Sequence, residues 1–458
     1  MGKRAVGMIL PVMAACLTVV LAAHSSRQDT TMLAATPPMG WNSWDSWGLT
    51  INETEFRDTV TWFHNHLQRY GWQYVVIDEG WFAQHPENPT GQQDYTISNQ
   101  GLYMPALNRF PSAAGDKGFK PLADWVHAQG LRFGIHIIHG IPREVVAHNL
   151  RIPHSHSTAA EAADTTDTCS WNSDNYGVKD NKAGQDYYDA MADLYARWGV
   201  DYLKVDCISR PYNTHEIHMI RHALDRSGRT IVLSLSPGPT PLENASDVVR
   251  NAQLWRISDD FWDVWSKAPD AKPFPQALKN QFGLLAQWQP YAGPGHWPDA
   301  DMLPIGYLGP HPGWQQPRQT RLTHDEVRSL ITLWSIARSP LFIGTNLLKM
   351  DAFTESMLTD PEVLAVNQYG ENQRPVIQKP DTVVWMSAAP EHTGDYVALF
   401  NLADQPQTLN YIWHDLGIQF GKFPVRDLWK RQEMGRTDHL EVTLPAHGAA
   451  LYKIEYRE

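Results

Sequence analysis

"YVVIDEGW", residues 74–81, joins four strand-forming residues to two adjacent carboxylates, Asp78 and Glu79. Its first half is apolar throughout, which is typical of a parallel strand that helices cover on both faces. An unpaired charge is very costly to bury, so these two acids need partners where the strand ends. The stretch therefore predicts a strand that delivers charged side chains to one edge of a sheet.

Similar apolar runs alternate with amphipathic stretches from about residue 36 to residue 365. The expected strands are 72–78, 131–138, 200–206, 230–236 and 252–258. The expected helices are 52–69, 121–129, 184–198, 214–226 and 324–338. Repeated βα units of this size indicate a (β/α)8 barrel or a doubly wound sheet. The length of the region favours the barrel, and so does the lack of a glycine-rich phosphate turn after the first strand.

The pattern changes near residues 363–373. Short alternating segments follow, without a long helical pattern between them, at 382–388, 395–402, 407–413, 423–429 and 440–454. They predict a small antiparallel β-sandwich. The expected organisation is a (β/α)8 catalytic barrel over 30–368 and a C-terminal β-sandwich over 369–458.

The first residues have the pattern of an export signal. Lys3 and Arg4 precede an apolar stretch that ends near Ala23, and polar residues follow it. We expect a signal peptide over residues 1–23 and an exported mature protein, periplasmic or extracellular, without stable membrane insertion after cleavage. A membrane anchor is the alternative, but the apolar run is short and contains Pro11.

Composition narrows the range of partners. Acidic residues outnumber basic ones, 50 to 38, which disfavours nucleic acids and anionic membrane surfaces. Most of the 19 tryptophans are expected in the core, but exposed indoles also suit the flat faces of sugars. Beyond the signal, Cys169 and Cys207 remain, and an exported protein can oxidise them. Sequence alone leaves open whether they meet.

Carboxylates stand where several of the expected strands end. They are Asp78, Glu79, Asp206, Asp259, Asp260, Asp299 and Asp301. The C-terminal ends of barrel strands converge on one face, so the fold would gather these acids around one pocket. A single Asp at such a junction is often a helix cap, but capping alone does not explain four acidic strand ends. Paired carboxylates suit glycoside hydrolysis, in which one acid protonates the leaving oxygen and the other attacks the sugar or activates water.

Other classes of protein compete with a glycosidase. A metal-dependent hydrolase would use His136 with His139, or His154 with His156. The first two are three residues apart on or beside a strand and cannot both face inward, and the second two lack a matching carboxylate motif. A non-catalytic sugar-binding protein would keep the tryptophans without needing opposed acids. A serine hydrolase is not supported, because the sequence has no G-x-S-x-G motif.

Six motifs follow one another along nearly the whole mature chain. They are "PPMGWNSW" (37–44), "YVVIDEGW" (74–81), "DYLKVD" (201–206), "WRISDD" (255–260), "GHWPDADML" (295–303) and "ARSPLFIG" (337–344). In this order they resemble glycoside hydrolase family 27, the group of α-galactosidases (melibiases) and α-N-acetylgalactosaminidases. The resemblance implies a (β/α)8 barrel followed by an antiparallel β-sandwich, no cofactor or metal, a carbohydrate substrate, and retention at the anomeric carbon.

The resemblance also implies roles for individual residues. The nucleophile falls on Asp206 and the acid/base on Asp260, with the adjacent Asp259 as a rival for the acid role. Residues expected to bind the sugar are Trp44, Asp78, Glu79, His136, Lys204, Ser236, Arg256, Asp301 and Met302.

Glu79 departs from the family pattern, which usually has a second aspartate at this position. In the family these two acids hold the 4- and 6-hydroxyls of galactose. The extra methylene of Glu79 pushes its carboxylate toward the hydroxymethyl arm of galactose, an arm that β-L-arabinopyranose lacks. If the side chain of Glu79 bends away instead, galactose still fits. The first expectation is hydrolysis of terminal α-D-galactosyl residues, and β-L-arabinopyranosidase is the alternative.

Two further departures concern Ser236 and Cys207. Ser236 and the two residues after it replace bulkier ones, so an α-N-acetylgalactosaminidase is a weaker alternative. Cys207 directly follows the expected nucleophile, whereas many relatives place a cysteine one residue later. A bridge between Cys169 and Cys207 therefore stays open.

Overall fold

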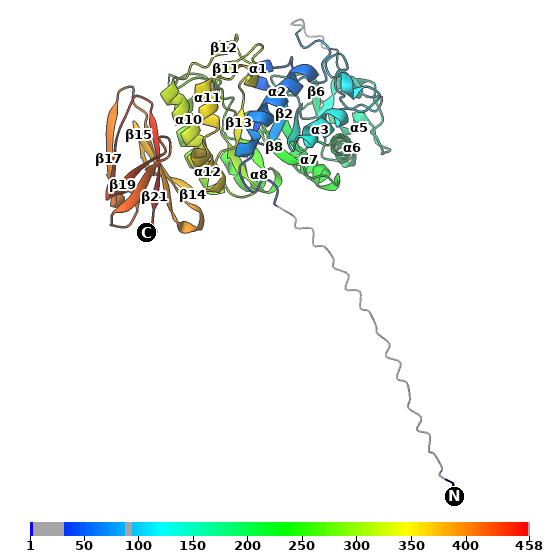
Figure 1. The fold of residues 1–458 in the computed structure, drawn as a ribbon. Helices are drawn as coiled ribbons and strands as arrows, with labels where there is room; N and C mark the ends of the chain where they lie inside the picture. Colours follow the sequence, from blue (N-terminus) through cyan, green and yellow to red (C-terminus); the bar gives the residue numbers. More distant parts are fainter. Residues whose placement is uncertain (3–31, 88–93, 269, 457–458) are drawn as a thin grey trace. The chain divides into compact units, whose positions relative to one another are not determined.

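The computed structural model describes residues 1–2, 32–87, 94–268 and 270–456 (Figure 1). Except for its first two residues, the expected signal peptide lies outside this part. The chain divides into Met1–Met32 and Leu33–Glu458, and the second unit holds every element described below. Within the described residues, no helix has both the length and the apolar character needed to cross a membrane.

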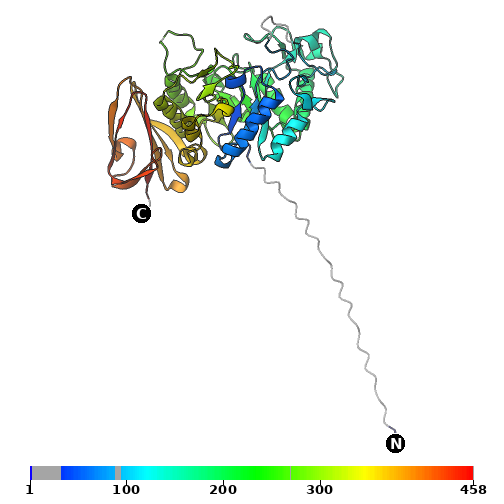
Figure 2. The same ribbon diagram turned by 45° about the horizontal axis from the view of Figure 1, so that its top comes forward.

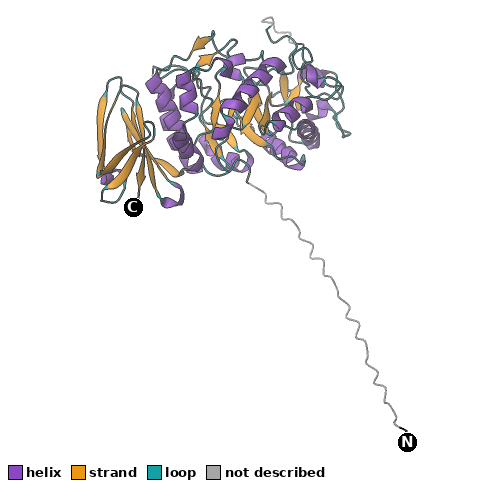
Figure 3. Ribbon diagram, in the orientation of Figure 1, coloured by secondary structure: helices purple, strands orange, loops and turns teal. Residues whose placement is uncertain are grey.

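Eight parallel strands form a curled sheet in the second unit (Figure 3). They are β1 (Met39–Asn42), β2 (Tyr74–Ile77), β3 (Arg132–Ile138), β7 (Tyr202–Asp206), β8 (Val232–Leu235), β9 (Leu254–Arg256), β10 (Trp297–Asp299) and β13 (Leu341–Ile343). Their order in space is β10-β9-β8-β7-β3-β2-β1-β13. A bridge between Leu303, shortly after β10, and Ile343 in β13 joins the two edges. This is the barrel that the alternating pattern predicts, although β1, β10 and β13 were not among the expected strands.

Helices lie around these strands (Figure 2). The longer ones are α2 (Glu53–His66), α3 (Lys120–Ala128), α6 (Lys182–Trp198), α7 (Thr214–Arg226), α9 (Leu278–Trp288), α10 (His324–Ala337) and α12 (Pro361–Tyr369). The short ones are α1 (Trp44–Trp47), α4 (Arg143–Ala147), α5 (Ala159–Ala162), α8 (Ala245–Asn251) and α11 (Ala352–Leu358). Asn52 and Glu55 form a capping box where α2 begins, and Gly199 takes the left-handed conformation after α6. These local signals explain why the expected helix limits lie within a few residues of the observed ones.

Short strands form two small sheets in the loops after the barrel strands. They involve β4 (Ile141–Pro142), β5 (Ala163–Asp164) and β6 (Asn175–Val178), and separately β11 (Tyr307–Leu308) with β12 (Arg318–Gln319). The first group orders the long segment between β3 and α6. That segment carries part of the pocket described below.

The C-terminal strands build two antiparallel sheets. They are β14 (Glu371–Lys379), β15 (Thr382–Ala388), β16 (Gly394–Asn401), β17 (Gln407–Ile412), β18 (Phe423–Asp427), β19 (Gln432–Thr437), β20 (His439–Leu444) and β21 (Ala449–Glu455). Six of them form a sheet in the order β14-β15-β16-β21-β18-β19, and β17 pairs with β20.

Alternation along β15 places its two faces in two different cores. Val384 and Met386 pack in the sandwich core with Leu409 of β17. Val383 and Trp385, one residue out of step, pack in the large core that includes the barrel helices. The sandwich is thus attached to the barrel by an apolar face as well as by the chain.

Candidate active site

A pocket at the carboxyl ends of the barrel strands is lined mainly by charged and aromatic side chains. The lining residues are Trp44, Asp45, Asp78, Glu79, Trp171, Lys204, Asp206, Pro237, Arg256, Asp260, Phe261, Trp262, Asp301 and Met302. Of the predicted site residues, only His136 and Ser236 are not among them. Both are almost fully buried.

Asp78 has the partners that a strand-end acid needs. Lys204 Nζ donates to its Oδ2 at 2.8 Å, and Asn42 Nδ2 donates to the same oxygen at 2.6 Å. Burial alone would raise the pKa of Asp78, but Lys204 and His136 outweigh it and hold the pKa of this carboxyl well below its usual range. Asp78 is therefore a charged acceptor that is held in place for hydroxyl groups.

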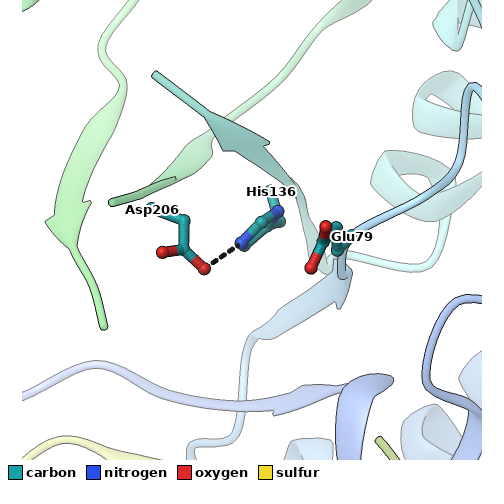
Figure 4. A group of neighbouring side chains, drawn as sticks. All are labelled: Glu79, His136 and Asp206. Carbon is teal, nitrogen blue, oxygen red and sulfur yellow. Dashed lines mark hydrogen bonds and ion pairs between the residues drawn. The ribbon is translucent and has the colours of Figure 1, made fainter. Parts of the chain in front are cut away.

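His136 lies between two carboxylates, those of Asp206 and Glu79 (Figure 4). Its Nε2 is 3.1 Å from Asp206 Oδ2 and 4.0 Å from Asp78 Oδ1. Burial lowers the pKa of His136, but Asp78 and the hydrogen bond to Asp206 outweigh it, so the pKa is raised overall. An ionised carboxylate can only accept, so in that state Asp206 Oδ2 takes its hydrogen bond from the imidazole N–H. Asp206 Oδ1 is buried and has no hydrogen-bond partner among the described residues.

A residue of a neighbouring loop holds the side chain of Glu79 in the pocket. Asn172 Nδ2 donates to its Oε1 at 2.9 Å. Burial raises the pKa of Glu79 to about 7, and Asp206 and Asp78 add to the shift while His136 opposes it. Near neutral pH this carboxyl exchanges a proton easily, unlike Asp78 beside it.

The loop that carries Asn172 is tied to the strand that carries Asp206. A disulfide joins Cys169 to Cys207, the residue directly after Asp206. This bridge answers the question that the sequence left open. It fixes the loop, and with it Asn172 and Trp171, against the end of β7.

Arg256 organises the acids on the other side of the pocket. Its Nη2 donates to Asp260 Oδ1 at 3.0 Å and also to Asp301 Oδ2, which accepts a second hydrogen bond from the backbone N–H of Phe261. Burial, together with Asp260 and Asp299, raises the pKa of Asp301 to about 7, although Arg256 opposes the shift.

Asp259 and Asp260 are adjacent in sequence but differ in their surroundings. Asp260 lines the pocket and contacts Arg256. Asp259 does not line the pocket and pairs with Arg210, Nη2 to Oδ1, at 2.7 Å. The geometry thus favours Asp260 as the acid nearest to a bound sugar.

Two groups of described residues bring potential metal ligands together. The first is Glu79, His136 and Asp206, and the second is His139, Asp167 and Glu216. In each group a histidine nitrogen already bonds to a carboxylate oxygen, Asp206 in the first and Glu216 in the second, both at 3.1 Å. The third member of each group has another partner, because Asn172 Nδ2 donates to Glu79 and Asn213 Nδ2 donates to Asp167. As strand geometry predicts, His136 and His139 do not face the same way: His136 contacts Asp206 and His139 contacts Glu216.

Five lining residues were not predicted from the sequence. They are Asp45, Trp171, Pro237, Phe261 and Trp262. Asp45 directly follows the "PPMGWNSW" motif, and Phe261 and Trp262 directly follow "WRISDD", so nearness to a motif was a usable signal. Trp171 had no such signal, because it lies in a long loop without periodicity.

Comparison with known proteins gives consistent matches over nearly the whole chain. A family model described as "Alpha galactosidase A" matches residues 174–369, and one described as "Alpha galactosidase C-terminal beta sandwich domain" matches residues 379–454. An α-galactosidase of Oryza sativa subsp. japonica is 30% identical, with 92% of this chain and 85% of that protein covered.

Two solved structures are more similar in sequence. A variant of a GH27 β-L-arabinopyranosidase from Geobacillus stearothermophilus, in complex with arabinose, is 42% identical with a TM-score of 0.87, covering 93% of this chain and 98% of the other. A putative α-N-acetylgalactosaminidase from Bacillus halodurans C-125 is 38% identical with a TM-score of 0.80, covering 93% and 98%.

Proposed function

This chain belongs to glycoside hydrolase family 27, and we propose that it removes terminal β-L-arabinopyranosyl residues with retention of configuration. The observation that carries the proposal is Glu79 in the pocket, where the family pattern has an aspartate. The 42% identity to a protein named β-L-arabinopyranosidase supports it.

The surroundings of Glu79 favour a carboxylate that stays in the pocket. Asn172 donates to its Oε1, and the imidazole of His136 lies beside it (Figure 4). To bend away, Glu79 would have to give up this partly buried hydrogen bond, which is worth about 0.5–1.5 kcal/mol. A carboxylate held there occupies space that the hydroxymethyl arm of galactose needs and arabinopyranose does not.

The remaining groups support a double displacement. Asp206 Oδ1 attacks the anomeric carbon, while Oδ2 stays bonded to His136. Asp260 protonates the leaving oxygen and then acts as base for the incoming water. Asp78 and Lys204 bind ring hydroxyls. For such retaining chemistry we expect the carboxyl groups of Asp206 and Asp260 to lie about 5–5.5 Å apart.

Shortening Glu79 tests the sugar preference. The wild type is expected to have the higher kcat/KM on 4-nitrophenyl β-L-arabinopyranoside than on 4-nitrophenyl α-D-galactopyranoside. Glu79→Asp removes one methylene and should shift the ratio toward the galactoside by about tenfold or more. Glu79→Gln, which keeps the length, is the matched control and should keep the preference. A wild type that prefers the galactoside would reject the proposed sugar.

Hydrolysis of α-D-galactosides is the second candidate function. It is favoured by the relatives named α-galactosidase that match over most of their length. Under this candidate Glu79→Asp would leave the ratio of the two kcat/KM values nearly unchanged.

The raised pKa of Glu79 also predicts how stability depends on pH. The folded protein holds this proton up to about pH 7, whereas the ordinary pKa is 4.5, so the folded state binds more protons than the unfolded chain between these values. The free energy of unfolding therefore falls as pH rises through this window. Glu79→Gln lacks this loss, so its melting temperature should exceed that of the wild type by more at about pH 8 than at about pH 5. An equal difference at both pH values, measured by differential scanning calorimetry, would contradict this.

We further propose that the protein is exported, with residues 1–23 as its signal peptide. The basic and then apolar pattern supports this, and the bridge between Cys169 and Cys207 is of the kind that persists in oxidising compartments. N-terminal sequencing of the protein recovered outside the cytoplasm should begin near residue 24; recovery only from the cytoplasm with an intact N-terminus would oppose it.

A further inference from the structure

Trp171 is an exposed aromatic side chain on the wall of the pocket. Of the lining residues, all of which are described, Trp171 alone is exposed, at 43%. Among the described residues, no ring or guanidinium stacks on its indole. A lining residue with this exposure lies at the mouth of the pocket, with an apolar face toward solvent.

The two proposed catalytic acids differ in depth. The side chain of Asp206 is 9% exposed and that of Asp260 is 33% exposed. The nucleophile therefore lies on the floor and the acid lies toward the mouth. Because the acid protonates the leaving oxygen, the leaving group points outward from the bound sugar, toward the level of Trp171.

Two anchors hold the backbone beside Trp171. Two residues before it, Cys169 is bonded to Cys207, and one residue after it, Asn172 is bonded to Glu79. An aromatic side chain on a segment held in this way loses little conformational freedom when it binds a ligand. An exposed indole that is held beside a pocket of hydroxyl-binding groups can stack on the flat face of a ring.

We propose that Trp171 forms the subsite for the leaving group, and that this group is a ring with an apolar face, either a pyranose or an aryl group. The inference rests on the proposed glycosidase function, since a leaving group presupposes a glycoside. It extends that function from the sugar that is removed to the group from which it is removed.

Three substrates that share one terminal sugar test this subsite. They are the glycosyl fluoride, which has no ring in its leaving group, the 4-nitrophenyl glycoside, and a disaccharide with the same linkage configuration. Trp171→Ala should lower kcat/KM by about fivefold to tenfold on the ring-bearing substrates, mainly through KM, and leave the fluoride within about twofold of the wild type. Trp171→Phe should restore much of the loss. A loss on the disaccharide alone identifies a pyranose, and a loss on the nitrophenyl glycoside alone identifies an aryl group.

Controls separate this result from damage to the fold or to the proposed function. Phe420, an aromatic residue of the C-terminal domain that is 81% exposed, gives the matched variant Phe420→Ala, which should match the wild type on all three substrates. Equal losses on all three with Trp171→Ala, or no loss on any, would overturn the subsite. A wild type that prefers galactosides would overturn the proposed sugar only, because the same three leaving groups can be compared on galactose.

Discussion

Asp206→Asn is expected to lower kcat by roughly 10⁴–10⁶-fold, because a neutral amide cannot form the glycosyl-enzyme. The substitution keeps the size of the side chain and an oxygen that can accept from His136, so the melting temperature should change little. Steady-state assays on the preferred 4-nitrophenyl glycoside would measure the loss.

Chemical rescue separates a lost nucleophile from a damaged pocket. Asp206→Gly leaves space next to the anomeric carbon, and added azide should restore release of nitrophenol. The product should be a glycosyl azide of inverted configuration, because azide attacks the anomeric carbon in a single displacement and no second displacement follows. Near-normal turnover by Asp206→Asn, or rescue with retention, would contradict the assignment of Asp206.

Asp260→Asn is expected to have the second largest effect, and this effect should depend on the leaving group. Loss of a general acid lowers the rate by about 10²–10⁴-fold when the leaving oxygen needs a proton. A disaccharide should show the full loss in kcat/KM, whereas the glycosyl fluoride, whose departure needs little protonation, should show much less.

Asp259→Asn is the matched control for Asp260→Asn. Asp259 pairs with Arg210 and does not line the pocket, so this variant should keep the wild-type rate on both substrates. The reverse outcome, a leaving-group-dependent loss in Asp259→Asn and a normal Asp260→Asn, would move the acid role to the neighbouring residue.

Much of the barrel and its pocket could be predicted because parallel strands have a simple rule. Their buried runs are mostly apolar, and the residues that follow their carboxyl ends lie on one face of the barrel. Asp78, Asp206 and Asp260 were found in this way. The family resemblance then added Trp44 and Arg256, which the rule alone does not identify.

Two strands of the sandwich were missed for a physical reason. β14 and β19 are the edges of the six-stranded sheet, and most of their residues are exposed or half-buried. Edge strands bury little on either face and tolerate residues such as Pro375, so the alternation that marks an inner strand is absent.

The position of His136 and Trp171 depends on contacts between distant segments. The imidazole of His136 is almost fully buried and lies within hydrogen-bond distance of Asp206. Trp171 reaches the pocket through the bridge of its loop to Cys207. No local pattern contains such information, because it arises only once β3, β7 and the loop are assembled.

The bridge between Cys169 and Cys207 has a practical consequence for preparing the protein. Reduction releases one of the two anchors beside Trp171 and Asn172, while the large barrel core, which does not include these cysteines, keeps its packing. Batches produced in a reducing cytoplasm and batches refolded in air should therefore be alike in secondary structure. Their ratio of arabinoside to galactoside turnover should differ, so that ratio serves as a quality check on thiol oxidation before any kinetic constant is compared between laboratories.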